Sequence, residues 1–138
     1  GCEYMKKIYL DMDGTIANLY EQKNWLERLQ KEDTTIFLEC QPLISENELL
    51  RLFPPKYYEI IILSMTPYNC SKEYHNQVIE QKNQWLDIHF PLLKKRIYKK
   101  YGNNKNLKNS VNAILIDDNE TIRNTFKGIA FNPIDLWG

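Results

Sequence analysis

The sequence is poor in cysteine, glycine and proline, has no excess of either charge and contains no long hydrophobic run. Its 138 residues include three cysteines, five glycines and six prolines, too few for a disulfide framework or a fibrous or low-complexity chain. Lysine plus arginine equals aspartate plus glutamate at 18 each, so no overall field attracts nucleic acid or an anionic membrane. No apolar run approaches the roughly 20 residues of a membrane span. We therefore expect no membrane partner and no sequence-specific nucleic-acid binding.

The cysteines also bear on the cellular compartment. Cys2, Cys40 and Cys70 are odd in number, widely spaced and without a Cys-x-x-Cys pair, which argues against a disulfide framework and a zinc site. A reducing compartment fits best, and no signal-peptide core precedes the first strand, so we expect a cytoplasmic protein. The length predicts one domain, residues 1–138, in which residues 1–4 are a remnant or a short extension before Met5.

Short apolar runs alternate with amphipathic stretches along the chain. We expect strands at 8–10, 58–63, 96–98, 113–116 and 129–131, and helices at 18–31, 45–53, 71–90 and 122–126. The spacing of Trp85 and Phe90 is explained by packing on a helix face, and we expect His75 and His89 to be exposed. Strands that alternate with helices favour a Rossmann-like α/β/α sandwich with a central parallel sheet.

Polar side chains follow three of the expected strands. They are Asp11 and Asp13 after the first strand, Ser64 and Thr66 after the second, and Asp117 and Asp118 after the fourth. Because ligands bind beyond the carboxyl ends of parallel strands, we expect these groups to converge. Carboxylate oxygens are the ligands that Mg²⁺ prefers, together with substrate phosphate and water.

Acids that follow strands are often ordinary turn or cap residues, and a lone Asp-x-Asp or Asp-Asp pair would be read that way. The longer motif Asp-x-Asp-Gly-Thr, which residues 11–15 match, is expected by chance on the order of once in a thousand chains of this length at ordinary residue frequencies. Its position directly after a strand makes a functional role the better interpretation.

These motifs resemble those of the haloacid dehalogenase superfamily of phosphohydrolases. Residues 11–15 resemble its first motif, Ser64 its second, Lys105 its third and Asp117-Asp118 its fourth, in the same order over residues 6–131. The stretch from Lys82 to Phe90 is similar to the 5′(3′)-deoxyribonucleotidases and their small bacterial and phage relatives. The resemblance implies a Mg²⁺-dependent phosphomonoesterase with a nucleotide substrate. The short interval between Asp13 and Ser64 predicts a minimal or absent cap domain, which departs from the nucleotidases, whose cap at this place is larger.

The resemblance also implies a role for each residue. Asp11 is the expected nucleophile, which forms an aspartyl-phosphate, and Asp13 the expected general acid and base. Mg²⁺ is expected on Asp11, Asp117 and the backbone carbonyl of Asp13, with Asp118 as a ligand through water or as a support. Ser64, Thr66 and Lys105 are the expected phosphate contacts. Lys99, Lys100 and Lys108 are alternatives to Lys105.

Other interpretations stay open at the level of sequence. A phospho-receiver domain also combines acids, a lysine and Mg²⁺, and a catalytically inactive binding domain could keep the same fold. Only 50 residues separate Asp13 from Ser64, so the site is expected to be open to a nucleotide, a phosphorylated nucleic-acid end or a phosphoprotein, or to be closed by a second subunit in a homodimer. Residues 94–108 contain seven basic residues and no acid, which indicates either polyanion attraction or a solvated face.

Overall fold

The sheet at the centre of the fold is parallel throughout. The structure, a computed structural model, describes residues 5–138, so Cys2 and the expectation for residues 1–4 lie outside the described residues. The strands are β1 (Lys6–Leu10), β2 (Tyr58–Thr66), β3 (Arg96–Lys100), β4 (Ile114–Ile116) and β5 (Ile129–Phe131). They are hydrogen-bonded in the order β3-β2-β1-β4-β5, and every neighbouring pair is parallel. The expected parallel α/β sheet is confirmed.

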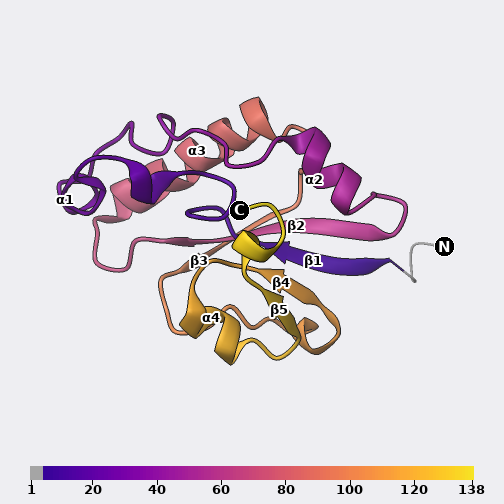
Figure 1. Ribbon diagram of the computed structural model, residues 1–138. Helices are drawn as coiled ribbons and strands as arrows, with labels where there is room; N and C mark the ends of the chain where they lie inside the picture. The colour runs from indigo at the N-terminus through magenta and orange to yellow at the C-terminus, as the bar shows by residue number, and fades with distance from the viewer. Residues whose placement is uncertain (1–4) are drawn as a thin grey trace.

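Helices cover both faces of this sheet. They are α1 (Trp25–Gln30), α2 (Glu46–Leu52), α3 (Lys72–His89) and α4 (Glu120–Thr125), with 3₁₀ turns η2 (Leu19–Glu21), η3 (Ser110–Asn112) and η4 (Pro133–Asp135). Helices α1, α2 and α3 lie on one side of the sheet and α4 on the other (Figure 1). Successive side chains of a strand point to opposite faces, so Ile8 and Leu10 join the core with Trp85, whereas Tyr9 packs with Ile122.

The strand order places a crevice beside β1. From β1 the chain builds β2 and β3 on one side and then crosses to build β4 and β5 on the other. Ile8 at the centre pairs with Ile60 of β2 and Ile114 of β4. Where the connections from two neighbouring parallel strands run in opposite directions, the carboxyl ends of those strands border a ligand-binding crevice. Here the two strands are β1 and β4. The acids that follow β1 and β4 therefore face the same crevice.

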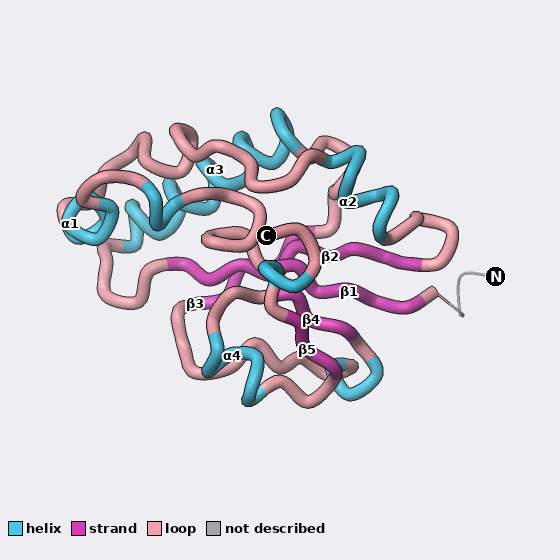
Figure 2. The backbone as a smooth tube through the Cα atoms, in the orientation of Figure 1, coloured by secondary structure: helices cyan, strands magenta, loops and turns pink. Residues whose placement is uncertain are grey.

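The single helix predicted over residues 18–31 is wrong. The structure has only η2 and the six-residue α1 there, separated by Asn24 with φ of 58°. A left-handed residue cannot continue a right-handed helix, so the helix breaks at this residue. Asn18, the expected cap, instead accepts a hydrogen bond from the backbone N–H of Gln41 at 2.7 Å through its side chain. Beyond α1 the chain crosses α3 as an irregular loop before α2 begins (Figure 2).

The second strand is longer than predicted. It continues to Thr66 because β3 pairs with it to the end, with Ser64 opposite Tyr98. The strand ends before Pro67, which has no N–H to donate. Ser64 and Thr66 therefore lie within the strand and not after it.

The two longer helices begin and end close to their predicted positions. The hydroxyl of Ser45 accepts from Glu48 N at 3.1 Å and that of Ser71 from Tyr74 N at 3.1 Å, which satisfies a free N–H at each helix start. The predicted packing of Trp85 and Phe90 is confirmed, since both are fully buried. The expectation that His75 and His89 are exposed is wrong, because both are partly buried.

Two further findings apply to residues 5–138. No helix in this part of the chain combines the length and the apolar character that crossing a membrane requires. Cys40 and Cys70 are both free thiols, Cys40 buried and Cys70 partly buried.

Candidate active site

The residues that follow β1 form a tight loop. The backbone N–H groups of residues 15–17 all donate to the carbonyl oxygen of Met12, at 3.0–3.2 Å. Gly14 has a φ of 79°, and a Cβ at this position would overlap the carboxylate of Asp118. Glycine is therefore required here both by the backbone angle and by the close approach of Asp118. This loop sets the positions of Asp11 and Asp13.

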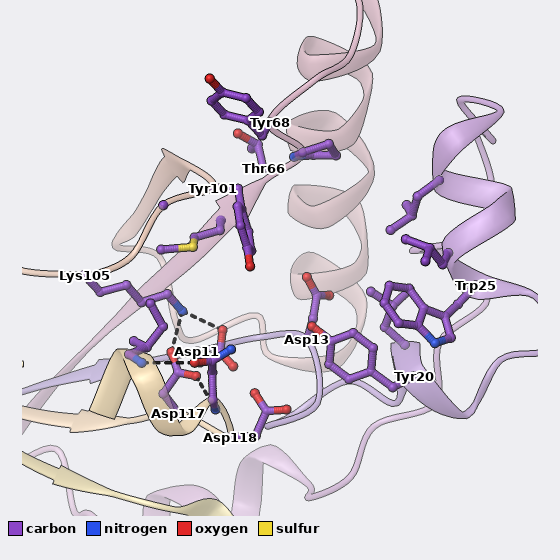
Figure 3. Close-up of a pocket in the computed structure, with 18 of the residues that line it drawn as sticks. Asp11, Asp13, Tyr20, Trp25, Thr66, Tyr68, Tyr101, Lys105, Asp117 and Asp118 are labelled. Carbon is purple, nitrogen blue, oxygen red and sulfur yellow. Dashed lines mark hydrogen bonds and ion pairs between the residues drawn. The ribbon is translucent and has the colours of Figure 1, made fainter. Parts of the chain in front are cut away.

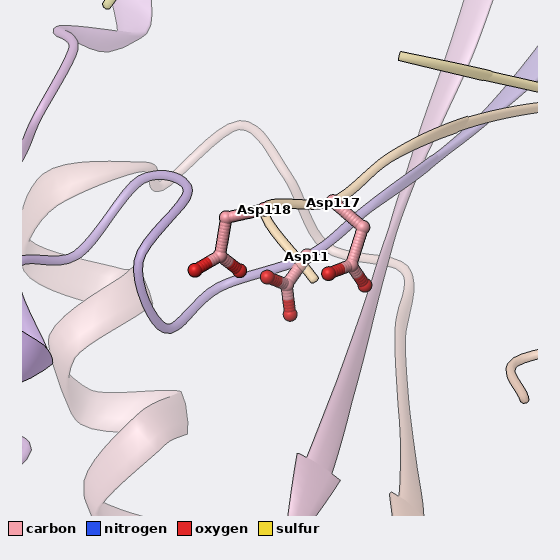
Figure 4. Close-up of side chains that lie close together, drawn as sticks. All are labelled: Asp11, Asp117 and Asp118. Carbon is pink, nitrogen blue, oxygen red and sulfur yellow. The ribbon is translucent and has the colours of Figure 1, made fainter. Parts of the chain in front are cut away.

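Three acids from the ends of β1 and β4 converge. Asp11, Asp117 and Asp118 each offer a carboxylate oxygen, and these oxygens lie within 4.8 Å of one another (Figure 4). The hydroxyl of Thr15 donates to Asp11 Oδ2 at 2.8 Å and accepts from the backbone N–H of Asp118 at 3.2 Å. Thr15 thereby connects the two acid-bearing segments. The carboxylate of Asp13 is not part of this trio.

Lys105 lies beside the acid trio. It is 2% exposed, and its Nζ donates to Asp11 Oδ1 and to Asp117 Oδ2, both at 2.7 Å. The residue comes from the loop between β3 and β4, twelve positions before Asp117, which is the distance that the resemblance to the third motif uses. The structure thus brings together four of the residues expected at the site.

The crowding of these acids perturbs their pKa values. Burial favours the neutral form of Asp11, but attraction to Lys105 and hydrogen bonds from Asp118, Lys105 and Thr15 together outweigh it and hold the pKa of Asp11 below its usual value. Burial and the nearby charge of Asp11 raise the pKa of Asp117 to about 7 and that of Asp118 to about 8. Burial opposes the charge on Lys105, yet the two partner carboxylates raise its pKa above the ordinary value. Lys105 therefore compensates only part of the negative charge of Asp11, Asp117 and Asp118.

Asp13 has a different cationic partner, which the sequence reasoning missed. Lys82 of α3 is fully buried, and its Nζ donates to Asp13 Oδ2 at 2.8 Å, Ser64 Oγ at 2.7 Å and Met65 O at 2.9 Å. The other oxygen of Asp13, Oδ1, is buried and has no hydrogen-bond partner. The signal that could have found Lys82 is the helical periodicity of α3. This periodicity places residue 82 on the apolar face of the helix, where a lysine needs a buried partner.

The two hydroxyl residues of β2 have different surroundings. Ser64 is fully buried and accepts from Lys82, and it is not among the residues that line the cavity. Thr66 lines the cavity and donates weakly to Lys99 O at 3.3 Å. The structure therefore gives Ser64 a position beneath Asp13, and Thr66 a position on the wall.

A cavity of about 670 Å³ opens above the acids. Tyr101 lies on one side of it, with its hydroxyl directed into the cavity, and Tyr20 and Trp25 lie on another side (Figure 3). The rings of Tyr20 and Trp25 pack edge to face with centroids 4.7 Å apart. Within residues 5–138, Lys105 is the one cation that lines the cavity, against the four acids Asp11, Asp13, Asp117 and Asp118. The walls beyond the acids are largely apolar and aromatic.

The basic stretch 94–108 is only partly free as a cationic surface. Lys95 pairs with Glu59 at 2.8 Å, Arg96 pairs with Asp87 at 2.8 Å, and Lys105 is buried in the site. Lys99 donates to Asn106 O at 3.2 Å. Much of the positive charge in this stretch is therefore used within the protein.

Comparison with known protein families and with curated proteins finds no match to this chain.

Proposed function

We propose that the chain is a Mg²⁺-dependent phosphomonoesterase in which Asp11 attacks phosphorus. The observation that supports this most directly is the arrangement of four acids and two buried lysines at the carboxyl ends of β1, β2 and β4. Asp11 is the acid that combines a lowered pKa with a position on the cavity wall. A carboxylate that is ionised and faces the substrate is suited to act as a nucleophile.

The acid trio fits a hard divalent cation. Three carboxylate oxygens within 4.8 Å of one another form an all-oxygen donor set of the kind that Mg²⁺ accepts. Burial, and after it the negative charge of Asp11, raises the pKa values of Asp117 and Asp118. Asp11, Asp117 and Asp118 would hold the cation, and a bound Mg²⁺ would supply charge neutralisation of a phosphate dianion.

In the first step of the proposed reaction, a carboxylate oxygen of Asp11 forms a bond to phosphorus as the ester P–O bond breaks. The electron pair of that bond leaves on the ester oxygen, which takes a proton from Asp13. Lys105, which contacts Asp11 and Asp117, offsets negative charge on the phosphoryl group. Lys82 holds the carboxyl group of Asp13 in place, and Asp13 lines the cavity in which the leaving group would lie.

In the second step, water attacks the aspartyl-phosphate and gives a proton to Asp13. The bond between phosphorus and the Asp11 oxygen breaks, inorganic phosphate leaves, and the Asp11 carboxylate is restored. The same residue thus acts as acid and then as base, which returns the site to its starting protonation state.

The shape and charge of the cavity favour a nucleoside monophosphate as substrate. Tyr101 and the Tyr20–Trp25 pair offer ring faces and edges on which a planar base can pack. Among the described residues, Lys105 is the sole cation on the walls of the cavity, so they offer no counter-charge to a second phosphate group. A phosphorylated nucleic-acid end would need further cations, but of the seven basic residues in 94–108 three are paired or buried and only Lys105 lines the cavity. We also propose a cytoplasmic location and closure of the cavity by a second subunit.

The proposal is tested by measuring phosphate release with Mg²⁺ from nucleoside monophosphates, sugar phosphates and phosphorylated oligonucleotides. We expect turnover on nucleoside monophosphates, loss of activity with EDTA and recovery with added Mg²⁺. Asp11→Asn should lower kcat by at least about 10³-fold while the fold is retained. Asp87→Asn, which alters an exposed acid on α3, is the matched control and should leave the rate unchanged.

The same assay separates this function from a phospho-receiver or a binding domain. A receiver would accept one phosphoryl group per chain from a small phosphodonor and would not turn over repeatedly. A binding domain would release none. Near-normal rates in Asp11→Asn would contradict the proposed nucleophile.

A further inference from the structure

The residues that follow β4 return twice to the acid-bearing segments. At the end of β5, the carbonyl oxygen of Phe131 accepts from the backbone N–H of Asp117 at 3.1 Å. Six residues later, the indole N–H of Trp137 donates to the carbonyl oxygen of Thr15 at 3.0 Å. Residues 131–137, which we term the closing segment, therefore contact both the loop after β1 and the segment after β4.

The closing segment is itself held in a defined conformation. The side chain of Asn132 accepts from Ile134 N at 3.1 Å at the start of η4, and Trp137 N donates to Pro133 O at 2.9 Å. Leu136 and Trp137 are partly buried and pack on the larger hydrophobic core. The indole is thus anchored by packing as well as by its hydrogen bond.

The position of Thr15 makes the indole contact relevant to the site. Thr15 is fully buried, and its hydroxyl joins Asp11 Oδ2 to the backbone of Asp118. A shift of Thr15 would break one or both of these hydrogen bonds. Its backbone has only short loop contacts to Met12 on one side, so the indole supplies a restraint from the other.

We propose that Trp137 is a positioning residue, which fixes Thr15 through its indole N–H and so sets the separation of Asp11 from Asp117 and Asp118. For its effect on catalysis this inference rests on the proposed function. Its effect on the arrangement of the acids does not rest on the proposed function, because the contacts exist in the protein without substrate. The loss of an outer hydrogen bond that orients metal ligands commonly weakens metal binding.

The test compares three variants of the full chain. Replacing Trp137 with benzothienylalanine, in which sulfur takes the place of the indole N–H, keeps the shape of the ring and removes the donor. Trp137→Phe removes the donor and part of the ring. Leu136→Ala removes packing from the same segment and keeps the indole hydrogen bond, so it is the matched control.

Three quantities are measured on each variant: hydrogen exchange of the Asp118 amide by NMR, Mg²⁺ affinity by titration, and the steady-state constants for phosphate release. Without the indole N–H we expect about tenfold faster exchange of the Asp118 amide than in Leu136→Ala. We expect about tenfold weaker Mg²⁺ binding, and kcat about tenfold lower with KM unchanged. The thermal stability of the benzothienylalanine variant should stay at or above that of Leu136→Ala.

The inference is overturned if the benzothienylalanine variant matches the wild type in amide exchange and in Mg²⁺ affinity. It is equally overturned if Leu136→Ala reproduces both changes, because packing of the segment would then explain them. A wild-type protein that releases no phosphate from any ester would remove the proposed function, and amide exchange and Mg²⁺ affinity would still decide the role of Trp137.

Discussion

Lys82→Met is predicted to reduce both stability and catalysis, because it removes the buried partner of Asp13. Lys82 is fully buried and makes three hydrogen bonds of 2.7–2.9 Å, to Asp13, Ser64 and the carbonyl of Met65. It also lies over the ring of Phe37, with Nζ 4.9 Å from the ring centroid. Methionine keeps most of the apolar length of the side chain and loses every one of the polar contacts.

The size of the effect follows from what is left behind. Removing one partner of a buried ion pair costs about 3–5 kcal/mol, since the remaining charge is uncompensated. The Asp13 side chain is 15% exposed, so water can reach part of it, and the lower end of that range applies. A loss of about 3 kcal/mol in the free energy of unfolding corresponds to a fall in Tm of about 10 °C for a domain of this size.

Catalysis should fall in a way that depends on the leaving group. If Lys82 positions Asp13 as the proton donor, its loss should lower kcat by about 10²- to 10⁴-fold for a nucleoside monophosphate, whose alkoxide must be protonated. p-Nitrophenyl phosphate has a leaving group that needs little protonation, so its hydrolysis should fall much less.

The assay combines thermal unfolding followed by circular dichroism with initial rates on the two substrates. Lys72→Met, an exposed lysine at the start of the same helix, is the matched control and should change the stability by at most about 0.5 kcal/mol. A Tm within about 2 °C of the wild type in Lys82→Met would refute the buried pair. An equal loss of rate on both substrates would refute the role assigned to Asp13.

Two other predictions concern the acid trio and the loop after β1. In EDTA, the free energy of unfolding should fall as pH rises from about 4 to about 8. In the folded state the pKa of Asp117 is raised to about 7 and that of Asp118 to about 8. The folded state therefore binds more protons than the unfolded state in this pH range. Mg²⁺ should reverse this loss, with affinity that increases with pH; a Tm that is independent of pH in EDTA would contradict the raised values. Gly14→Ala should cost at least about 2 kcal/mol in chemical denaturation and abolish turnover, since Gly14 has a φ of 79° and no room for a Cβ. Gly102→Ala, where a Cβ would meet nothing closer than 3.8 Å, should be nearly neutral, and similar costs at both glycines would show that the packing at Gly14 is not as described.

The alternation of strands and helices was predictable because each element has a local signal. Apolar runs mark the buried strands, and Ser45 and Ser71 each supply a side-chain oxygen at a helix start. The segment 18–31 was not predictable by periodicity, since its apolar residues have helical spacing while Asn24 takes a left-handed conformation. The segment also makes tertiary contacts, such as the hydrogen bond from Gln41 N to Asn18 Oδ1, and these are invisible in a single sequence.

The site residues that follow strands could be predicted from the sequence, whereas Lys82, which lies in a helix, could not. Asp11, Asp117 and Asp118 converge because parallel strands end at one edge of the sheet. Lys105 was placed by its distance from the acids in a motif, and its contacts agree with that placement. Lys82 lies in the middle of a helix, where nothing in its neighbours along the chain indicates that it reaches an acid 69 positions away.

The two buried lysines give the acids of the cavity separate partners. Lys105 contacts Asp11 and Asp117, whereas Lys82 contacts Asp13 and none of the trio. Carboxyl groups in one site can take different roles only if their surroundings differ. Asp11 and Asp13 are two residues apart in the sequence, yet in the described part of the chain they share no hydrogen-bond partner. The surroundings of Asp11 and Asp13 therefore depend on a loop and a helix that are distant in sequence, and we predict that a substitution in either one affects one proposed role without the other.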